Sequence, residues 1–262
     1  MNRGYGVSAL VDSGIATRLA EAAEESGYMS FWVNDVPGGN GLEQLAAVQA
    51  ATSTIRTGVG VLAADRWPAA LIVREVNRLG LDAKRLVIGI GAGALGRGSL
   101  SSTAEIASQV RTQLPAQVMI GALGPEMCRL AGANSDGVIL NWLTPAAARK
   151  SSEITRTAAA ETGQPVPEVI GYVRTAAEPD AHQRLTTEAT NYEAYPAYRR
   201  HFARMGVSAL ETTVNGSPGE IAIRLDEYAG SVDEIVVRAI AANETLESYL
   251  TVLRAARPGA TE

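Results

Sequence analysis

Closely spaced glycines near the middle of the chain follow an apolar run, and their pattern is typical of a phosphate-binding loop. Gly91, Gly93 and Gly96 match the Gly-x-Gly-x-x-Gly spacing that brings a backbone close to a dinucleotide pyrophosphate. No acidic residue ends the next apolar run, Gln117–Ala122, to hold a ribose hydroxyl. Three interpretations stay open: a dinucleotide site, a tight turn that needs positive φ, or a backbone that a flat or phosphorylated cofactor approaches closely.

A second glycine cluster, Gly121–Met127, also ends an apolar run and precedes a helical pattern. Pro125 suits the first position of a helix, where its missing N–H costs nothing. The N–H groups that follow, together with the helix dipole, form a site for an anion. Glu126 is a competitor for that positive end. The segment therefore predicts either phosphate binding or a helix that caps itself.

Three single residues also carry chemistry, and each has a structural alternative. Asp35 follows an aromatic run and suits either a turn or a cofactor contact. Trp142 ends a strand-like run, where it belongs either to the core or to a binding site. Arg238 lies within the apolar run Glu234–Ile240 and, if buried, needs an acidic partner or an anionic ligand.

The remaining reactive residue types are scarce. Cys128 is the sole cysteine, which excludes an internal disulfide and a cysteine-based metal cluster. His182 and His201 are the only histidines, too few for a multi-histidine metal site or a conventional triad. We expect both histidines to be solvated, Cys128 to be a small buried residue, and no metal to be bound.

Composition narrows the range of partners. The chain has 262 residues, with 23 Lys and Arg against 28 Asp and Glu, and a net charge of −5. An acidic protein is a poor electrostatic match for nucleic acid or an anionic membrane. The N-terminus lacks a signal-peptide pattern, and the sequence has no apolar stretch long enough to cross a membrane. We therefore expect a cytoplasmic protein whose partner is a small molecule.

The elements that would position these residues alternate along the chain. Apolar runs that resemble strands are separated by helical patterns, which is typical of parallel βα units. The strand-like runs are Tyr5–Leu10, Ser30–Asn34, Thr57–Ala63, Leu86–Ile90, Gln117–Ala122, Gly137–Trp142, Val169–Thr175 and Glu234–Ile240. This number of runs predicts an α/β fold, a (β/α)8 TIM barrel formed by a single domain over residues 1–262.

Helical patterns fill the intervals between these runs, with one irregularity. The predicted helices are Ile15–Ser26, Leu42–Thr54, Pro68 to about Leu79, Thr103–Leu114 capped by Ser101 or Ser102, Pro125–Ala133, one opening at Pro145, and Thr245–Ala255. Between Pro179 and Gly230 two helical patterns precede the last strand, one carrying Tyr192, Tyr195, Tyr198 and Phe202 and the other Pro218–Tyr228. We interpret this stretch as an extended helical crossover before strand 8.

Several segments, in order along nearly the whole chain, resemble the bacterial luciferase-like monooxygenase family. They are Gly27–Asp35, Ile55–Leu62, Gly121–Met127, Arg129–Gly132, Asp136–Pro145, Tyr198–Gly206 and Gly216–Arg238. Members of this family are (β/α)8 barrels that bind FMN or coenzyme F-420 at the C-terminal ends of the strands. The resemblance implies an oxidoreductase that acts on a small organic substrate and that commonly forms a homodimer.

The resemblance also implies roles for individual residues. Cofactor contacts fall on Asp35, Ala63, Ala64, Gly91, Gly93, Leu123, Gly124, Pro125, Glu126, Met127, Asn141 and Trp142. Members often carry a non-proline cis peptide at the position of Ala63 and Ala64, and the backbone of Leu123–Met127 would hold a phosphate. Asp35, Arg174 and Arg238 are the candidate catalytic residues, and the two arginines could reach an anionic substrate or the coenzyme tail.

Two departures from the family pattern bear on activity. Val36 follows Asp35 where many members have a histidine, and the insertion after strand 4 is reduced to Ala94–Ser102. The chain therefore resembles a short form of the family with a more open rim. The alternatives are a non-catalytic flavin-binding protein that has lost its lid and proton donor, and a barrel lyase or isomerase with Asp35 as base.

The cofactor decides the reaction, because oxygen adds to reduced FMN at a carbon that the deazaflavin cannot use. FMN would imply monooxygenation, and coenzyme F-420 would imply hydride transfer. The segment Asn141–Pro145 resembles the F-420-type branch, so we favour coenzyme F-420 by analogy.

Overall fold

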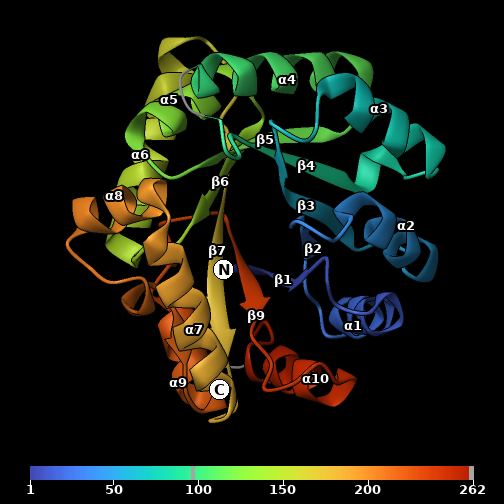
Figure 1. Cartoon of the computed structure of the whole chain (residues 1–262), viewed down its shortest axis with the longest axis vertical. Coiled ribbons are helices and arrows are strands. Elements are labelled where there is room, and N and C mark those ends of the chain that lie inside the picture. The colour runs from blue at the N-terminus through green and yellow to red at the C-terminus, as the bar shows by residue number, and fades with distance from the viewer. Residues whose placement is uncertain (96–97, 260–262) are drawn as a thin grey trace.

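The strands form a closed parallel barrel in the computed structural model, which describes residues 1–95 and 98–259 (Figure 1). The sheet order is β6-β5-β4-β3-β2-β1-β9-β7, and the pairing of β6 with β7 closes the circle. The strands are β1 (Asn2–Ser8), β2 (Ser30–Asn34), β3 (Arg56–Ala63), β4 (Leu86–Gly91), β5 (Gln117–Ala122), β6 (Gly137–Asn141), β7 (Glu168–Ala176), β8 (Val214–Asn215) and β9 (Glu234–Ala239). The predicted (β/α)8 TIM barrel is confirmed, with the short β8 added at the edge of β7.

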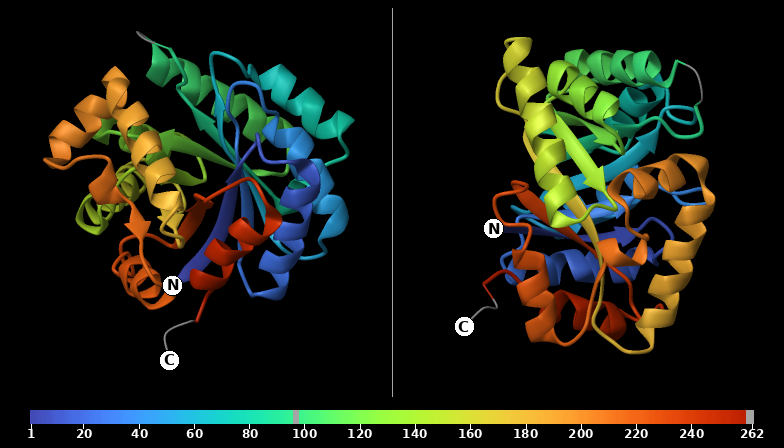
Figure 2. Two further views of the ribbon diagram at one scale, coloured as in Figure 1. Left: turned by 60° about the horizontal axis from the view of Figure 1, so that its bottom comes forward. Right: turned by 90° about the vertical axis from the view of Figure 1, so that its left-hand side faces the viewer.

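Helices surround the barrel on its outer side (Figure 2). They are α1 (Ser13–Glu25), α2 (Gly41–Ala51), α3 (Ala69–Arg78), α4 (Ser99–Gln113), α5 (Pro125–Asn134), α6 (Pro145–Glu161), α7 (Ala181–Ala194), α8 (Pro196–Met205), α9 (Pro218–Asp226) and α10 (Leu246–Ala255). Two short 3-10 turns, η1 (Ala83–Arg85) and η2 (Leu210–Thr212), complete the elements. No helix of the described part of the chain is long and apolar enough to cross a membrane.

The strands read as continuous apolar runs because both of their faces are buried, as is usual in parallel sheets. The larger core lies between the strands and the helices. A smaller cluster fills the barrel, with Trp32 and Tyr172 in edge-to-face contact at 5.6 Å between ring centroids. The interior is thus packed side chains, which leaves the rims for function.

Charged groups occupy the N-terminal end of the barrel. Arg56 donates to both Glu168 and Glu234 at 2.8 Å, and Glu234 also accepts a hydrogen bond from Ser30. The carboxylate of Glu234 is almost fully buried, so its ion pair with Arg56 supplies the partner that a buried charge requires. We assign this network a structural role, in which it joins β3, β7 and β9 at the N-terminal end of the barrel.

The structure corrects several boundaries. The helical crossover contains α7, α8 and α9, because Pro196 ends the first predicted helix at Tyr195 and starts a new one. Gly98, in the left-handed region with φ of 83°, precedes α4, so neither Ser101 nor Ser102 is the cap. Ser101 instead lies inside the first turn and donates back to the carbonyl of Gly98. Gly96 of the predicted glycine motif lies outside the described residues.

Candidate functional site

Two adjoining cavities open at the C-terminal ends of the strands. The first, the glycine cavity, has a volume of about 500 Å³ and lies against β3, β4 and β5 and the loops that follow them. The second, the arginine cavity, has a volume of about 380 Å³ and lies against β1, β2, β7 and β9. Both are lined by Asn34, Gly60, Val61, Asn141 and Tyr198, which form their common boundary.

The wall of the glycine cavity is built around a bulge in β3. The register with β4 shifts between Val59 and Leu62, which releases Gly60 and Val61 from regular pairing. A Cβ atom at Gly91 would lie 2.5 Å from a methyl carbon of Val61, and one at Gly121 would lie 2.8 Å from the other. Glycine is needed at both positions because the Val61 side chain lies over them.

The non-proline cis peptide is in this bulge, between Gly60 and Val61. The expectation of such a bond at Ala63 and Ala64 was therefore wrong in position. Ala63 lines the arginine cavity, whereas Ala64 lines neither cavity and donates its N–H to the carbonyl of Gly91 at 2.8 Å.

Gly93 serves as a turn residue at the mouth of the glycine cavity. Its φ is +61°, and a Cβ atom there would lie 1.9 Å from the carboxylate of Asp65. The tight-turn interpretation of the glycine loop therefore holds for Gly93, which also lines the cavity. The dinucleotide interpretation does not fit a closed barrel, because that fingerprint belongs to the first turn of an open sheet.

Two buried polar atoms of residues that line the glycine cavity have no hydrogen-bond partner among the described residues. They are the hydroxyl of Tyr172 and Oδ1 of Asn34. The Asn34 amide nitrogen donates to the carbonyl of Gly60 at 2.8 Å, which fixes the orientation of that side chain. Burial raises the pKa of Tyr172 well above its ordinary value, so the hydroxyl stays protonated. A donor and an acceptor are thus presented without partners, which is unusual for buried polar atoms.

The opposite end of the glycine cavity is the N-terminus of α5. Gly124 precedes Pro125 and supplies no side-chain cap, and the first N–H bonded there is that of Cys128, to the carbonyl of Gly124. The N–H groups of Glu126 and Met127 bond to no described residue. Arg200 of α8 lines the cavity together with Leu123, Gly124 and Met127.

Glu126 does not compete for this helix end. Its side chain is 72% exposed and forms an ion pair with Arg129, one turn further along α5. Neither Glu126 nor Pro125 is among the residues that line the cavity. The unbonded N–H groups and the helix dipole together suit an anion such as a phosphate, and Arg200, which also lines the cavity, adds a positive charge.

His201 joins α8 to this part of the rim. The prediction that it is solvated was wrong: its side chain is buried, with Nδ1 facing the carbonyl oxygen of Leu123 and Nε2 facing that of Trp142 at 2.8 Å. Arg204 also donates to the carbonyl of Leu123. Burial lowers the pKa of His201, although the contacts with the two carbonyl oxygens act in the opposite direction. His182, by contrast, is exposed as predicted.

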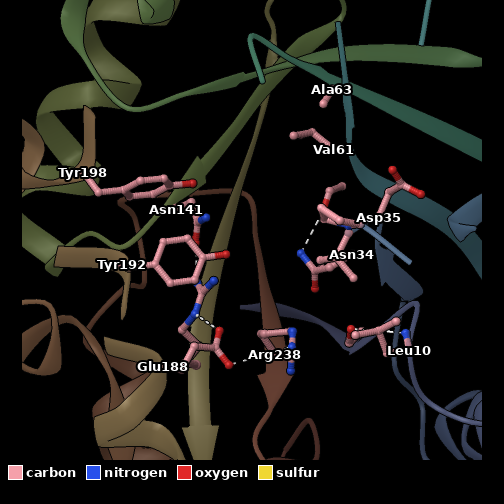
Figure 3. Close-up of a pocket in the computed structure, with 15 residues that line it drawn as sticks. Leu10, Asn34, Asp35, Val61, Ala63, Asn141, Glu188, Tyr192, Tyr198 and Arg238 are labelled. Carbon is pink, nitrogen blue, oxygen red and sulfur yellow. Dashed lines mark hydrogen bonds and ion pairs between the residues drawn. The ribbon is translucent and has the colours of Figure 1, made fainter. Parts of the chain in front are cut away.

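The arginine cavity holds a cluster of three charged side chains (Figure 3). Arg174 Nε donates to Glu188 at 2.8 Å, and Nη2 of Arg238 lies 4.0 Å from the other carboxylate oxygen. Burial opposes ionisation of Glu188, but Arg238 and Arg174 outweigh it and hold its pKa below the usual range. Glu188 therefore carries a negative charge between two positive ones.

Arg174 contacts three different side chains. Besides Glu188, it donates to Oδ1 of Asn141, and its guanidinium carbon lies 3.7 Å from the centroid of the Trp142 ring. Trp142 is buried behind Arg174, with a positive φ of 54°, and lines neither cavity. We expected Trp142 to lie beside a cofactor ring. This expectation is wrong, because Arg174 lies between Trp142 and the cavity. Asn141 does line both cavities.

The carboxylate of Asp35 points away from the arginine cavity, although its residue lines it (Figure 3). One oxygen accepts from Arg66 at 2.7 Å and from Trp67 at 3.0 Å, and the other from the N–H of Gly41 at 3.0 Å. The side chain is fully buried beneath these donors. This geometry corrects the expectation of an acid–base role: Asp35 ties the loops after β2 and β3 together.

The residues that line the cavities and that the sequence did not identify include Asn34, Tyr172, Glu188 and Arg200. A signal existed for Asn34, since polar residues at the C-terminal ends of barrel strands face the functional rim. Glu188 precedes Tyr192 by one helical turn, which places both on one face of α7. No group of potential metal ligands occurs among residues 1–95 and 98–259.

Comparison with known proteins gives matches in structure only. No family model and no curated protein matches the sequence. An F-420-dependent secondary alcohol dehydrogenase, solved with an F-420–acetone adduct, is similar with a TM-score of 0.78 and 14% identity, covering 100% of this chain and 99% of that one.

Two further solved structures are similar over their full lengths. The coenzyme F-420-dependent tetrahydromethanopterin reductase from Methanopyrus kandleri has a TM-score of 0.75 and 16% identity, with 98% of each chain covered. The oxygenating constituent of 3,6-diketocamphane monooxygenase from Pseudomonas putida, solved with FMN, has a TM-score of 0.68 and 16% identity, covering 98% of this chain and 97% of that one. These likenesses establish the shared barrel fold.

Proposed function

We propose that this protein is a luciferase-like oxidoreductase that binds a flavin or deazaflavin in the glycine cavity and transfers hydride to or from a small organic molecule. The observation that carries the proposal is that each end of this cavity has polar groups without partners in the described part of the chain. One end is lined by Tyr172 and Asn34, whose hydroxyl and Oδ1 are buried without a partner among the described residues, and the other lies at the start of α5, where the first N–H groups bond to no described residue. A heterocycle with a phosphorylated side chain supplies groups for both ends.

The residues of the cavity fit such a cofactor. Tyr172 can donate to a ring carbonyl, and Asn34 can accept from a ring N–H, which would remove the cost of two unsatisfied buried atoms. Gly91 and Gly121 leave room for the Val61 side chain, which lines the cavity. Arg200 and the N–H groups of Glu126 and Met127 would bind the phosphate. When bound, coenzyme F-420 would supply a two-electron hydride carrier, and FMN would also permit oxygen activation.

We favour coenzyme F-420, as the segment Asn141–Pro145 suggests, and the solved structures with the same fold include users of both cofactors. The test is a titration of the protein, free of cofactor, with coenzyme F-420, FMN and riboflavin, followed by cofactor fluorescence. We expect F-420 to bind with a Kd of about 1–10 µM, near −8 kcal/mol, and at least tenfold more tightly than FMN. Riboflavin should bind more weakly than FMN because it lacks the phosphate. Absence of binding by both F-420 and FMN at about 100 µM would contradict the proposal.

One observation favours a second candidate, a flavin-binding protein without turnover. The Asp35 carboxylate is enclosed by its three donors, and both ring nitrogens of His201 face backbone carbonyl oxygens. Neither residue is therefore a free proton donor at the cavity. Stoichiometric binding with no change in cofactor redox state across a panel of alcohols, aldehydes and ketones would favour this candidate, and any substrate-dependent redox change would eliminate it.

A further inference from the structure

The arginine cavity carries an excess of buried positive charge. Arg174 and Arg238 contribute two guanidinium groups, and Glu188 contributes one carboxylate, which leaves one positive charge. Asp35 does not offset it, because its carboxylate is paired with Arg66 on the far side of the loop. A charge enclosed in this way is costly unless an anion completes the cluster.

The two arginines are not equivalent. Arg174 is 3% exposed, its Nε and Nη1 donate to Glu188 and Asn141, and its guanidinium lies over the Trp142 ring. Arg238 has a buried Nε without a partner among the described residues, and its nearest carboxylate oxygen is 4.0 Å away. Its one hydrogen bond to the described part of the chain is to the carbonyl of Ala239. Among the described residues, Arg238 therefore holds most of the unused donors of the cluster.

The rest of the arginine cavity suits the body of an organic molecule. The rings of Tyr192 and Tyr198 line one side, and Leu10, 63% exposed, stands on the opposite side of the opening (Figure 3). Ser8 also lines the cavity, and its hydroxyl accepts from the N–H of Leu10, which leaves its own proton free to donate. A volume of about 380 Å³ is within the range of small-molecule sites.

We propose that the arginine cavity is the substrate site and that it selects a monocarboxylate with an aromatic or apolar body, held at its carboxylate by Arg238. A single negative charge balances the cluster, and the paired donors of a guanidinium match the two oxygens of a carboxylate. The body would extend toward the boundary with the glycine cavity, formed by Val61 and Asn141. The role of the bound acid as substrate rests on the proposed function, but its binding does not.

The probes are phenylacetate and its neutral counterpart phenylacetamide, titrated by calorimetry into the protein with and without saturating coenzyme F-420. We expect phenylacetate to bind at least tenfold more tightly than phenylacetamide. Arg238→Gln should reduce that preference to less than threefold, and Arg238→Lys should keep part of it because the charge remains. Arg254→Gln is the matched control, since Arg254 is exposed on α10, pairs with Glu247 and lines neither cavity.

Circular dichroism and urea unfolding of each variant show whether it folds. If Arg238→Gln does not fold, the comparison of acid and amide is made with Arg238→Lys. The inference is overturned if acid and amide bind equally, if neither binds at 10 mM in either state, or if folded Arg238→Gln retains the preference. Failure of the two claims can be told apart: a carboxylate preference without F-420 or FMN binding keeps this site and removes the proposed function. Cofactor binding without a preference for the carboxylate keeps the proposed function and removes this site.

Discussion

At the scale of single residues, the hydroxyl of Tyr172 is a useful probe because it is buried and lacks a partner among the described residues. A polar group buried in that way destabilises the protein until a ligand satisfies it. We therefore expect Tyr172→Phe to raise the free energy of unfolding of the cofactor-free protein by about 1 kcal/mol. The same change should weaken cofactor binding by roughly threefold to tenfold, the loss of one hydrogen bond.

Tyr5→Phe is the control for this substitution. The Tyr5 hydroxyl is also fully buried, but it donates to the carbonyl of Tyr249 at 2.7 Å. Its removal should lower stability by about 1 kcal/mol and leave cofactor affinity unchanged. Urea unfolding and fluorescence titration measure the two effects, and a Tyr172→Phe protein with unaltered cofactor affinity would refute the role given to the hydroxyl.

Asp35→Asn separates a structural carboxylate from a catalytic one. The amide keeps one acceptor oxygen, loses the charge that pairs with Arg66, and turns an NH2 group toward donors. We expect a loss of about 1–3 kcal/mol in the free energy of unfolding, measured with urea. Glu105→Gln, on the exposed face of α4, should change stability by less than about 0.5 kcal/mol. Full stability combined with lost turnover would restore the catalytic assignment.

The sequence alone did not predict side-chain partners that are distant along the chain. Asp35 meets donors from the loop after β3, and Arg238 meets Glu188 from α7, which precedes it by a long stretch of chain. A strand-end position indicates that a residue is at the functional rim, but it does not indicate which way the side chain turns. Distant partners decide that direction, and no local pattern identifies them.

At the scale of elements, α8 is attached to the rim through His201. Burial lowers the pKa of this histidine in the folded protein, against an unfolded value of about 6.5. The unfolded chain therefore binds more protons near pH 6, so the stability of the folded state falls as the pH drops through about 6.5. The contribution cannot exceed about 1.4 kcal/mol per pH unit, the effect of one proton.

His201→Gln should remove this part of the pH dependence. The measurement is urea unfolding of wild type and variant at pH 7.5 and 5.5, with the exposed His182→Gln as the matched control. We expect the loss of stability between the two pH values to be smaller in His201→Gln than in the other two proteins. Equal losses in all three would contradict the attachment of α8 through a neutral, buried imidazole.

Element boundaries were predictable where a local signal fixes them. The strands Ser30–Asn34 and Gln117–Ala122 were predicted to the residue, because polar or glycine positions bound their apolar runs. The break at Pro196 was missed because the tyrosines and Phe202 keep a helical spacing across it. The packing of α7 and α8 on Trp142 holds those aromatic side chains together on both sides of the break.

At the scale of the whole molecule, barrel closure explains how distant residues meet at one rim. The parallel strands all present their C-terminal ends on the same side, so Asn34, Gly91, Asn141 and Arg174 come together from four strands. The closed fold was predictable from the order of apolar runs and helices. The division of the rim into two cavities was not, because it depends on the β3 bulge and on the side chains of α7 and α8.

The central claim is that the glycine cavity binds the cofactor, and a crystal structure of the protein with coenzyme F-420 tests it most directly. We predict the deazaflavin ring beside Val61, Gly91 and Gly121, within hydrogen-bond distance of Tyr172 or Asn34, and the phosphate at the start of α5. A ring bound elsewhere, or an empty glycine cavity in crystals grown at saturating cofactor, would contradict the account.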